Sequence, residues 1–144
     1  MTHFHTPVLV VHALVAVMGL GSITSIAIVA ATARRAGRGS AEVLPWLGPL
    51  LRYAAISLAA VLSTGVLLDL TANGAFRAAW WLRGSVLLIV ATGLLHAQAR
   101  RAVRLGLAKE ADSDLVLRRV EWIGYGMCAL IGVIVVLMLV KPFQ

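Results

Sequence analysis

Histidine is the residue type in this sequence whose placement points most directly to chemistry. His12 lies in a stretch from Pro7 to Ala33 that contains no formally charged residue. An ionisable side chain is costly to bury in lipid, so one found there is a candidate for function. A neutral imidazole can also bind a metal or a haem iron. We expect His12 to be a cofactor ligand; the alternative is a ring that hydrogen-bonds to a neighbouring helix.

Three further histidines extend the set of candidate ligands. His5 and His12 are seven residues apart, on one helical face if the helix begins that early. Imidazole suits copper or zinc, so His3, His5 and His12 form a candidate metal site. The alternative is that the first two histidines are solvated near a chain end. His96 is a further candidate cofactor ligand, or an interfacial side chain beside Gln98.

Asp69 and Arg83 complete the candidate cofactor site. A carboxylate and a guanidinium next to apolar stretches form either a structural ion pair or part of a functional site. The sequence has no Gly-rich phosphate loop, CxxC, HExxH or nucleophile-elbow motif. The candidate cofactor-binding residues are therefore His12, Asp69, Arg83 and His96.

Four apolar stretches must position these side chains. Hydrophobic residues make up 60% of the 144 residues, and the mean hydropathy is +0.92. A helix of about 20 apolar residues spans the hydrocarbon core of a bilayer, and it satisfies its own backbone groups there. We predict an all-α integral membrane protein with one domain, 1–144, whose four transmembrane helices form an up-and-down antiparallel bundle. The helices are expected at about 7–33, 46–70, 78–104 and 114–140.

Short polar segments and small residues refine this prediction. Asn73-Gly74 predicts a turn after the second helix. Asp112 or Ser113 is expected to cap the start of the fourth helix. Small residues spaced by four predict close helix contacts, within the bundle or between two copies in a homo-oligomer. They are Gly21 and Ser25 in the first helix, and Gly124, Cys128 and Gly132 in the fourth.

Positive charge sets the expected orientation in the membrane. Cytoplasmic loops of membrane proteins carry an excess of Lys and Arg, so the first and third connections are expected in the cytoplasm and both termini outside. The formal charge of +7 is then explained by anionic lipid rather than by nucleic acid as the partner. The cations expected on the cytoplasmic side are Arg34, Arg35, Arg38, Arg52, Arg100, Arg101, Arg104, Lys109, Arg118 and Arg119. Those expected outside are Arg77, Arg83 and Lys141.

This orientation predicts which candidate residues share a depth. His12, Asp69 and Arg83 are expected in the outer half of the membrane, on three different helices. His96 is expected near the cytoplasmic end of its helix. At about 1.5 Å of rise per residue, His12 and His96 should differ in depth by roughly 15 Å. We therefore do not expect both histidines to bind the same iron or metal ion.

Four short motifs occur along the first three helices: His12 with Gly19-Leu20-Gly21, Ser63-Thr64-Gly65-Val66-Leu67-Leu68, Trp81-Leu82-Arg83 and Leu95-His96. Together they resemble the motifs of small four-helix bacterial membrane proteins related to the copper-resistance protein CopD and the HemJ-type protoporphyrinogen oxidase. The resemblance covers the first three helices, about two thirds of the chain. It implies a multi-pass protein of the bacterial inner membrane.

The resemblance implies a ligand for two of these positions. In HemJ-type enzymes a histidine in the first helix and a lysine in the third are associated with haem or porphyrin, and the matching residues are His12 and Arg83. Arginine cannot donate a lone pair to iron, but its guanidinium suits a haem propionate. In the copper-related members, histidine and methionine near the outer face are the implied ligands, which here are His3, His5, His12 and Met18.

Three functions therefore remain open from the sequence. The first is a redox-type membrane protein that binds haem or another tetrapyrrole near the outer face. The second is an element that transports or admits copper. The third is a non-catalytic membrane interaction protein whose basic loops bind anionic lipid. Visible absorption and metal content of the purified protein distinguish the three.

Overall fold

The chain folds into four long α-helices. The computed structural model describes residues 5–37, 40–74, 79–109 and 112–140, and within these ranges the helices are α1 (His5–Arg35), α2 (Ser40–Thr71), α3 (Trp80–Leu107) and α4 (Ser113–Val140). All four are long and apolar enough to cross a membrane. The predicted all-α, four-helix architecture is confirmed, and the protein is of the multi-pass membrane type.

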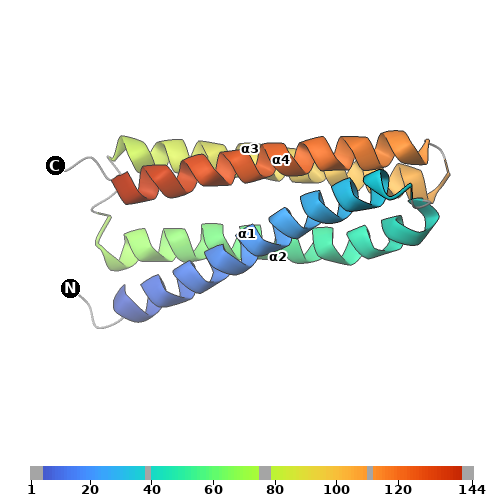
Figure 1. The fold of residues 1–144 in the computed structure, drawn as a ribbon. Helices are drawn as coiled ribbons and strands as arrows, with labels where there is room; N and C mark the ends of the chain where they lie inside the picture. The colour runs from blue at the N-terminus through green and yellow to red at the C-terminus, as the bar shows by residue number, and fades with distance from the viewer. Residues whose placement is uncertain (1–4, 38–39, 75–78, 110–111, 141–144) are drawn as a thin grey trace.

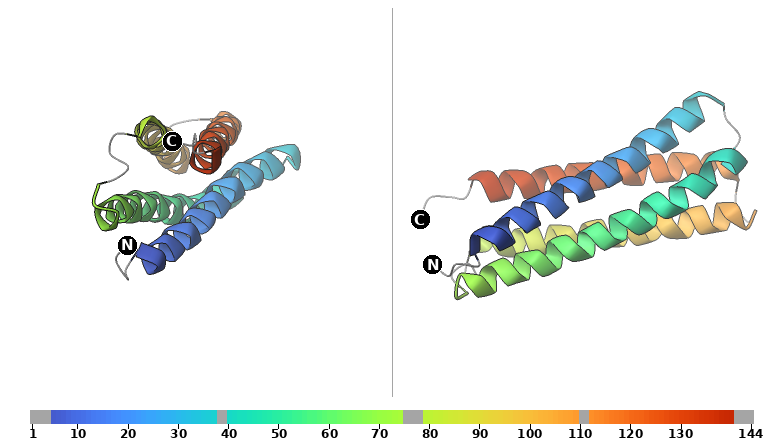
Figure 2. Two further views of the ribbon diagram at one scale, coloured as in Figure 1. Left: turned by 90° about the vertical axis from the view of Figure 1, so that its left-hand side faces the viewer. Right: turned by 90° about the horizontal axis from the view of Figure 1, so that it is seen from below.

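The helices run up and down along one bundle axis (Figure 1). α1 begins and α4 ends at the same end of the bundle, where the chain also passes from α2 to α3. We call this the histidine end, because His5 and His12 lie there. The opposite end, where α1 and α3 end and α2 and α4 begin, we call the basic end. Viewed along the axis, α1 lies beside α2 and α3 beside α4, and α1 crosses the bundle obliquely (Figure 2).

The buried apolar core lies in the half of the bundle nearer the basic end. Within the described residues, the core comes from the second half of α1, the first half of α2, the second half of α3 and the first half of α4. Its largest members are 2% exposed or less. They are Ile23, Ile26, Leu44, Leu47, Leu51, Leu117, Val120 and Met127. Most tertiary packing of large apolar side chains is therefore concentrated away from the histidine end.

α2 begins six residues earlier than predicted and includes Pro45 and Pro49. Proline removes an N–H donor and is poorly tolerated in a helix interior, which is why the sequence suggested a start at about residue 46. Both prolines fall in the first three turns, where few hydrogen bonds depend on them. Glu42 lies in the first turn of α2, where a carboxylate is stabilised by the positive end of the helix dipole.

The small residues of α4 contact α1 at one position but not at another. A Cβ atom at Gly124 would lie 2.8 Å from the Ala27 Cβ and 3.0 Å from the Ala27 Cα, whereas a Cβ at Gly132 would meet nothing within 4 Å. Cys128 Sγ is 3.7 Å from Thr24 Oγ1. The backbones of α1 and α4 therefore approach most closely at Gly124.

The small-residue face predicted on α1 points away from the other helices. Gly21 and Ser25 are exposed, and a Cβ added at Gly21 would meet nothing within 4 Å. The Ser25 hydroxyl donates to the Gly21 carbonyl within the same helix. Among the described residues, Gly21 and Ser25 therefore do not form the close helix contact that their spacing predicts.

Candidate functional site

α1 and α2 meet along a seam that repeats every seven residues. His5 faces Thr71 and His12 faces Thr64. A Cβ at Gly19 would lie 3.3 Å from Ser57 Cβ. Residues seven apart lie on nearly the same face of a helix, so each step of seven along α1 matches a step of seven back along α2. We call the first two contacts the His–Thr pairs.

The His12–Thr64 pair defines the protonation of the ring. The Thr64 hydroxyl is 2.7 Å from the Ala60 carbonyl oxygen and donates to it. Thr64 Oγ1 must then accept at its other contact, so His12 Nδ1–H donates to it over 2.8 Å. In a neutral imidazole only one nitrogen carries the proton. His12 Nε2 is therefore left with a lone pair.

Gly65 gives the His12 ring its space. A Cβ at Gly65 would lie 3.5 Å from His12 Cε1, at ordinary contact distance. A side chain longer than alanine at this position would extend into the space of the imidazole. The Thr64-Gly65 dipeptide thus supplies both the hydrogen bond that orients the ring and the room that it needs.

The His5–Thr71 pair repeats this arrangement one heptad nearer the membrane surface. His5 Nδ1 is 3.2 Å from Thr71 Oγ1, and the Thr71 hydroxyl donates to the Leu68 carbonyl over 3.0 Å. Seven residues separate the two histidines by about 10.5 Å along α1.

The structure does not bring His5 and His12, the two described ligands of the candidate metal site, together. The rings of His5 and His12 contact different threonines, and this arrangement leaves them too far apart to bind one ion, since metal–nitrogen bonds are about 2 Å long. His3 lies outside the described residues. Within the described ranges, no group of three or more His, Cys, Asp or Glu side chains is placed to hold a metal ion.

His96 lies in the other half of the bundle from His12. It is buried, and its Nε2–H donates to the Leu51 carbonyl oxygen over 2.7 Å. Leu51 precedes Thr64 by thirteen residues, which places the two histidines about 20 Å apart along α2. His96 therefore joins α3 to α2 in the core and does not share a site with His12.

Asp69 and Arg83 lie at the histidine end, on different helices. Asp69 is half-buried in the last turns of α2, and Arg83 is exposed near the start of α3. Trp81 and Ser85 are buried, and at about 100° per residue Arg83 lies on the opposite side of α3 from both. Arg83 consequently does not face His12 across the bundle.

One ion pair at the basic end was not anticipated from the sequence. Arg34 Nε is 2.7 Å from Glu121 Oε2, and Arg34 Nη2 is 3.5 Å from Glu121 Oε1. Glu121 is 4% exposed, so the pair joins the end of α1 to the first half of α4 beside the core. The sequence did carry a signal, since Glu121 is an acid followed at once by an apolar span. Thr71 was also missed, and Thr64 was named only as part of a motif, although the two threonines repeat the spacing of His5 and His12.

The class of the protein follows from these helices: it is a multi-pass α-helical membrane protein with histidine-containing contacts between α1 and α2. No protein-family model matches the sequence, and no match was found among curated proteins or solved structures.

Proposed function

We propose that the protein binds a tetrapyrrole, with haem as the first candidate, at the histidine end and with His12 Nε2 as the axial ligand. The observation that carries this proposal is the hydrogen bond from His12 Nδ1–H to Thr64 Oγ1. Histidines that bind metals commonly donate their other ring N–H to an acceptor that fixes the tautomer and the orientation. The pair with Thr64 meets that requirement.

The residues around His12 suit a large apolar ligand. His12 is half-buried, and Leu9, one turn earlier on the same side of α1, is apolar and exposed. Haem would supply one-electron redox chemistry, with a potential that depends on its axial ligand and surroundings. His12 would bind the iron and Thr64 would orient the ring. The proposal gives no role to Arg83 or His96, because neither faces His12.

Absorption spectroscopy of the purified chain tests the proposal. We expect the wild-type protein, supplied with haem during expression and purified in detergent, to show a Soret band that His12→Ala removes. His5→Ala is the matched control, since it removes the other His–Thr pair, and it should keep the band. A wild-type protein without a Soret band, or a band that persists in His12→Ala, contradicts the proposal.

A second candidate function, association with anionic lipid, is favoured by the charge of the basic end. Lys and Arg near an anionic surface contribute about 1 kcal/mol each to membrane association. Spin-labelled phosphatidylglycerol should associate with the protein more than phosphatidylcholine does, and the preference should fall with salt. Equal association of the two lipids would contradict it. The exposed cations described at this end are Arg35, Arg52, Arg100, Arg101, Arg104, Lys109, Arg118 and Arg119.

A further inference from the structure

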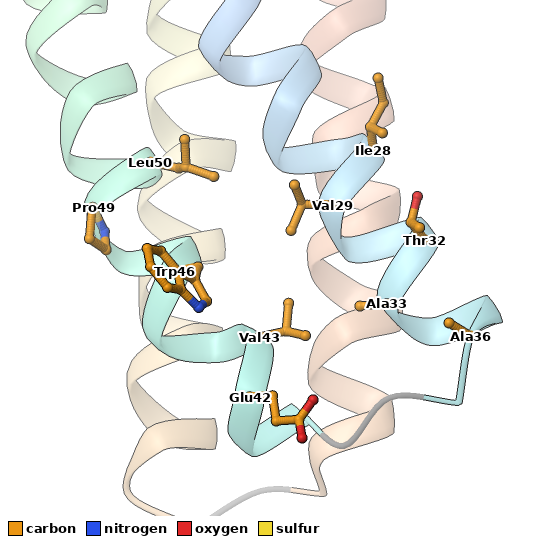
Figure 3. A pocket seen from close by; sticks show the side chains of 10 residues that line it. All are labelled: Ile28, Val29, Thr32, Ala33, Ala36, Glu42, Val43, Trp46, Pro49 and Leu50. Carbon is orange, nitrogen blue, oxygen red and sulfur yellow. The ribbon is translucent and has the colours of Figure 1, made fainter.

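A groove lies between α1 and α2 at the basic end (Figure 3). Its volume is about 820 Å³, within the range of about 300–1,000 Å³ that is typical of small-molecule sites. Apolar side chains form most of its walls. The lining residues are Ile28, Val29, Thr32, Ala33 and Ala36 from α1 and its end, and Glu42, Val43, Trp46, Pro49 and Leu50 from α2.

Glu42 is the one charged residue among those that line the groove. Its carboxylate is directed toward α1 (Figure 3). Among the residues that the structure describes, none forms a hydrogen bond or an ion pair with this carboxylate. A negative charge next to apolar walls attracts a positively charged ligand, and this carboxylate is available to bind one.

Trp46 supplies an aromatic ring beside the carboxylate. It lines the groove and follows Glu42 by four residues, which places both on the same side of α2. Trp46 is 71% exposed, so part of its ring surface is free to contact a ligand. Cations bind over the face of tryptophan, and aromatic rings recognise quaternary ammonium groups in this way. Glu42 and Trp46 therefore favour the same ligand, a cation whose charge is surrounded by apolar groups.

The arginines of the basic end do not line the groove. Arg34 donates to Glu121 of α4, and the charge of Arg35 acts on the same carboxylate. At physiological salt, exposed charges interact over about 8 Å, so a ligand in contact with Glu42 responds chiefly to that carboxylate. The exposed cations at this end can therefore attract anionic lipid while the groove binds a cation.

We propose that this groove binds a lipophilic cation, an organic ammonium or phosphonium compound whose charge lies beside Glu42 and whose apolar groups contact Trp46 and the walls. An anion of the same shape would be repelled by Glu42. The site is at the opposite end of the bundle from His12. It does not depend on the tetrapyrrole proposal, and it uses none of the cations that we expect to attract anionic lipid.

Binding of tetraphenylphosphonium to the full-length protein in a neutral detergent tests this inference. Equilibrium dialysis measures the Kd for this cation and for tetraphenylborate, an anion of nearly the same size and shape. We expect the wild-type protein to bind tetraphenylphosphonium more tightly than tetraphenylborate. Glu42→Gln should weaken the binding of tetraphenylphosphonium about tenfold and remove the preference for the cation, because the attraction between the opposite charges is lost.

Two further variants locate the site. Asp114→Asn removes an exposed acid at the same end of the bundle but outside the groove, and it should bind tetraphenylphosphonium as the wild type does. Trp46→Leu keeps an apolar side chain but removes the ring, and it should weaken binding about threefold. Helical circular dichroism checks that each variant is folded.

Three results would overturn the inference. The first is a wild-type protein that binds tetraphenylborate as tightly as tetraphenylphosphonium. The second is unchanged binding of tetraphenylphosphonium in folded Glu42→Gln or Trp46→Leu. The third is a loss of binding in Asp114→Asn as large as that in Glu42→Gln, since the cation would then respond to the acids of this end in general and not to the groove.

Discussion

The threonine opposite His12 determines the tautomer of the ring. The Thr64 hydroxyl donates its proton to the Ala60 carbonyl of its own helix, so Thr64 accepts from His12. The neutral His12 ring is thereby held with Nε2 unprotonated. The chemistry of this His–Thr pair therefore depends on a short side chain that has little reactivity of its own.

Replacing Thr64 by valine should separate the hydrogen bond from the packing. Valine keeps the shape of threonine but cannot accept from His12 Nδ1–H. We expect Thr64→Val to lower the free energy of unfolding in detergent by about 0.6 kcal/mol, the average for hydrogen bonds between membrane helices. Ser63→Ala is the control, because the exposed Ser63 hydroxyl bonds within its own helix, to Ala59. Equal stabilities of the two variants would show that the pair is not stabilising.

Glu121 should be more sensitive to neutralisation than the exposed acids. Its carboxylate is buried and accepts from Arg34, and removing one partner of a buried ion pair is strongly destabilising. Glu121→Gln should lower the melting temperature by about 5 °C, whereas Asp114→Asn, at an exposed position on the same helix, should leave it unchanged. The double variant Arg34→Gln with Glu121→Gln should recover part of the loss. If the double variant melts as low as Glu121→Gln alone, the broken ion pair is not the cause of the lower melting temperature.

At the scale of the helix, local chemistry was predictable from sequence and the contacts between helices were not. The Asn73-Gly74 turn is confirmed, since both residues have positive φ. The cap at Asp112 is confirmed too, because its carboxylate accepts from the Asp114 N–H over 3.0 Å. Both features depend on neighbours in the sequence. The early start of α2 and the outward direction of Arg83 depend on how whole helices pack, which composition does not encode.

The candidate site shows the same division. The expected separation of His12 from His96 follows from rise per residue alone, and the structure also places them far apart along the bundle. Whether Arg83 faces His12 depends on how α3 is rotated about its own axis. That rotation is fixed by the burial of Trp81 and Ser85. Polar and apolar residues of α3 occur on all sides of the helix, so the sequence pattern did not show which face is buried.

The close approach of α4 to α1 should depend on Gly124 and not on Gly132. Alanine at this position would bring its Cβ against the Ala27 backbone, and overpacking typically costs about 1–3 kcal/mol. Gly132→Ala is the matched control, since nothing lies within 4 Å of its Cβ. It should be neutral or stabilising by about 0.5–1 kcal/mol, because alanine favours helix over glycine. Thermal unfolding in detergent measures both, and similar effects would contradict the close approach.

At the scale of the whole molecule, the two halves of the bundle differ in their buried side chains and polar contacts. The basic half contains the large buried side chains, the His96–Leu51 hydrogen bond and the Arg34–Glu121 ion pair. The histidine half contains the His–Thr pairs and few large buried side chains among the described residues. Stability is therefore expected to come from the basic half. The histidine half is the part of the bundle in which we propose that a tetrapyrrole binds.

Two leucines of α2 test this division of the bundle. Leu47 is 0% exposed in the core of the basic half, and Leu67 is 44% exposed in the histidine half. Leu47→Ala should cost about 2–5 kcal/mol, because it leaves a cavity among packed neighbours. Leu67→Ala removes the same atoms from a partly exposed position and should cost less than about 1 kcal/mol. Both are measured by unfolding in the same detergent. Equal costs would mean that the histidine half is packed as tightly as the basic half, and the space required for a tetrapyrrole beside His12 would then be missing.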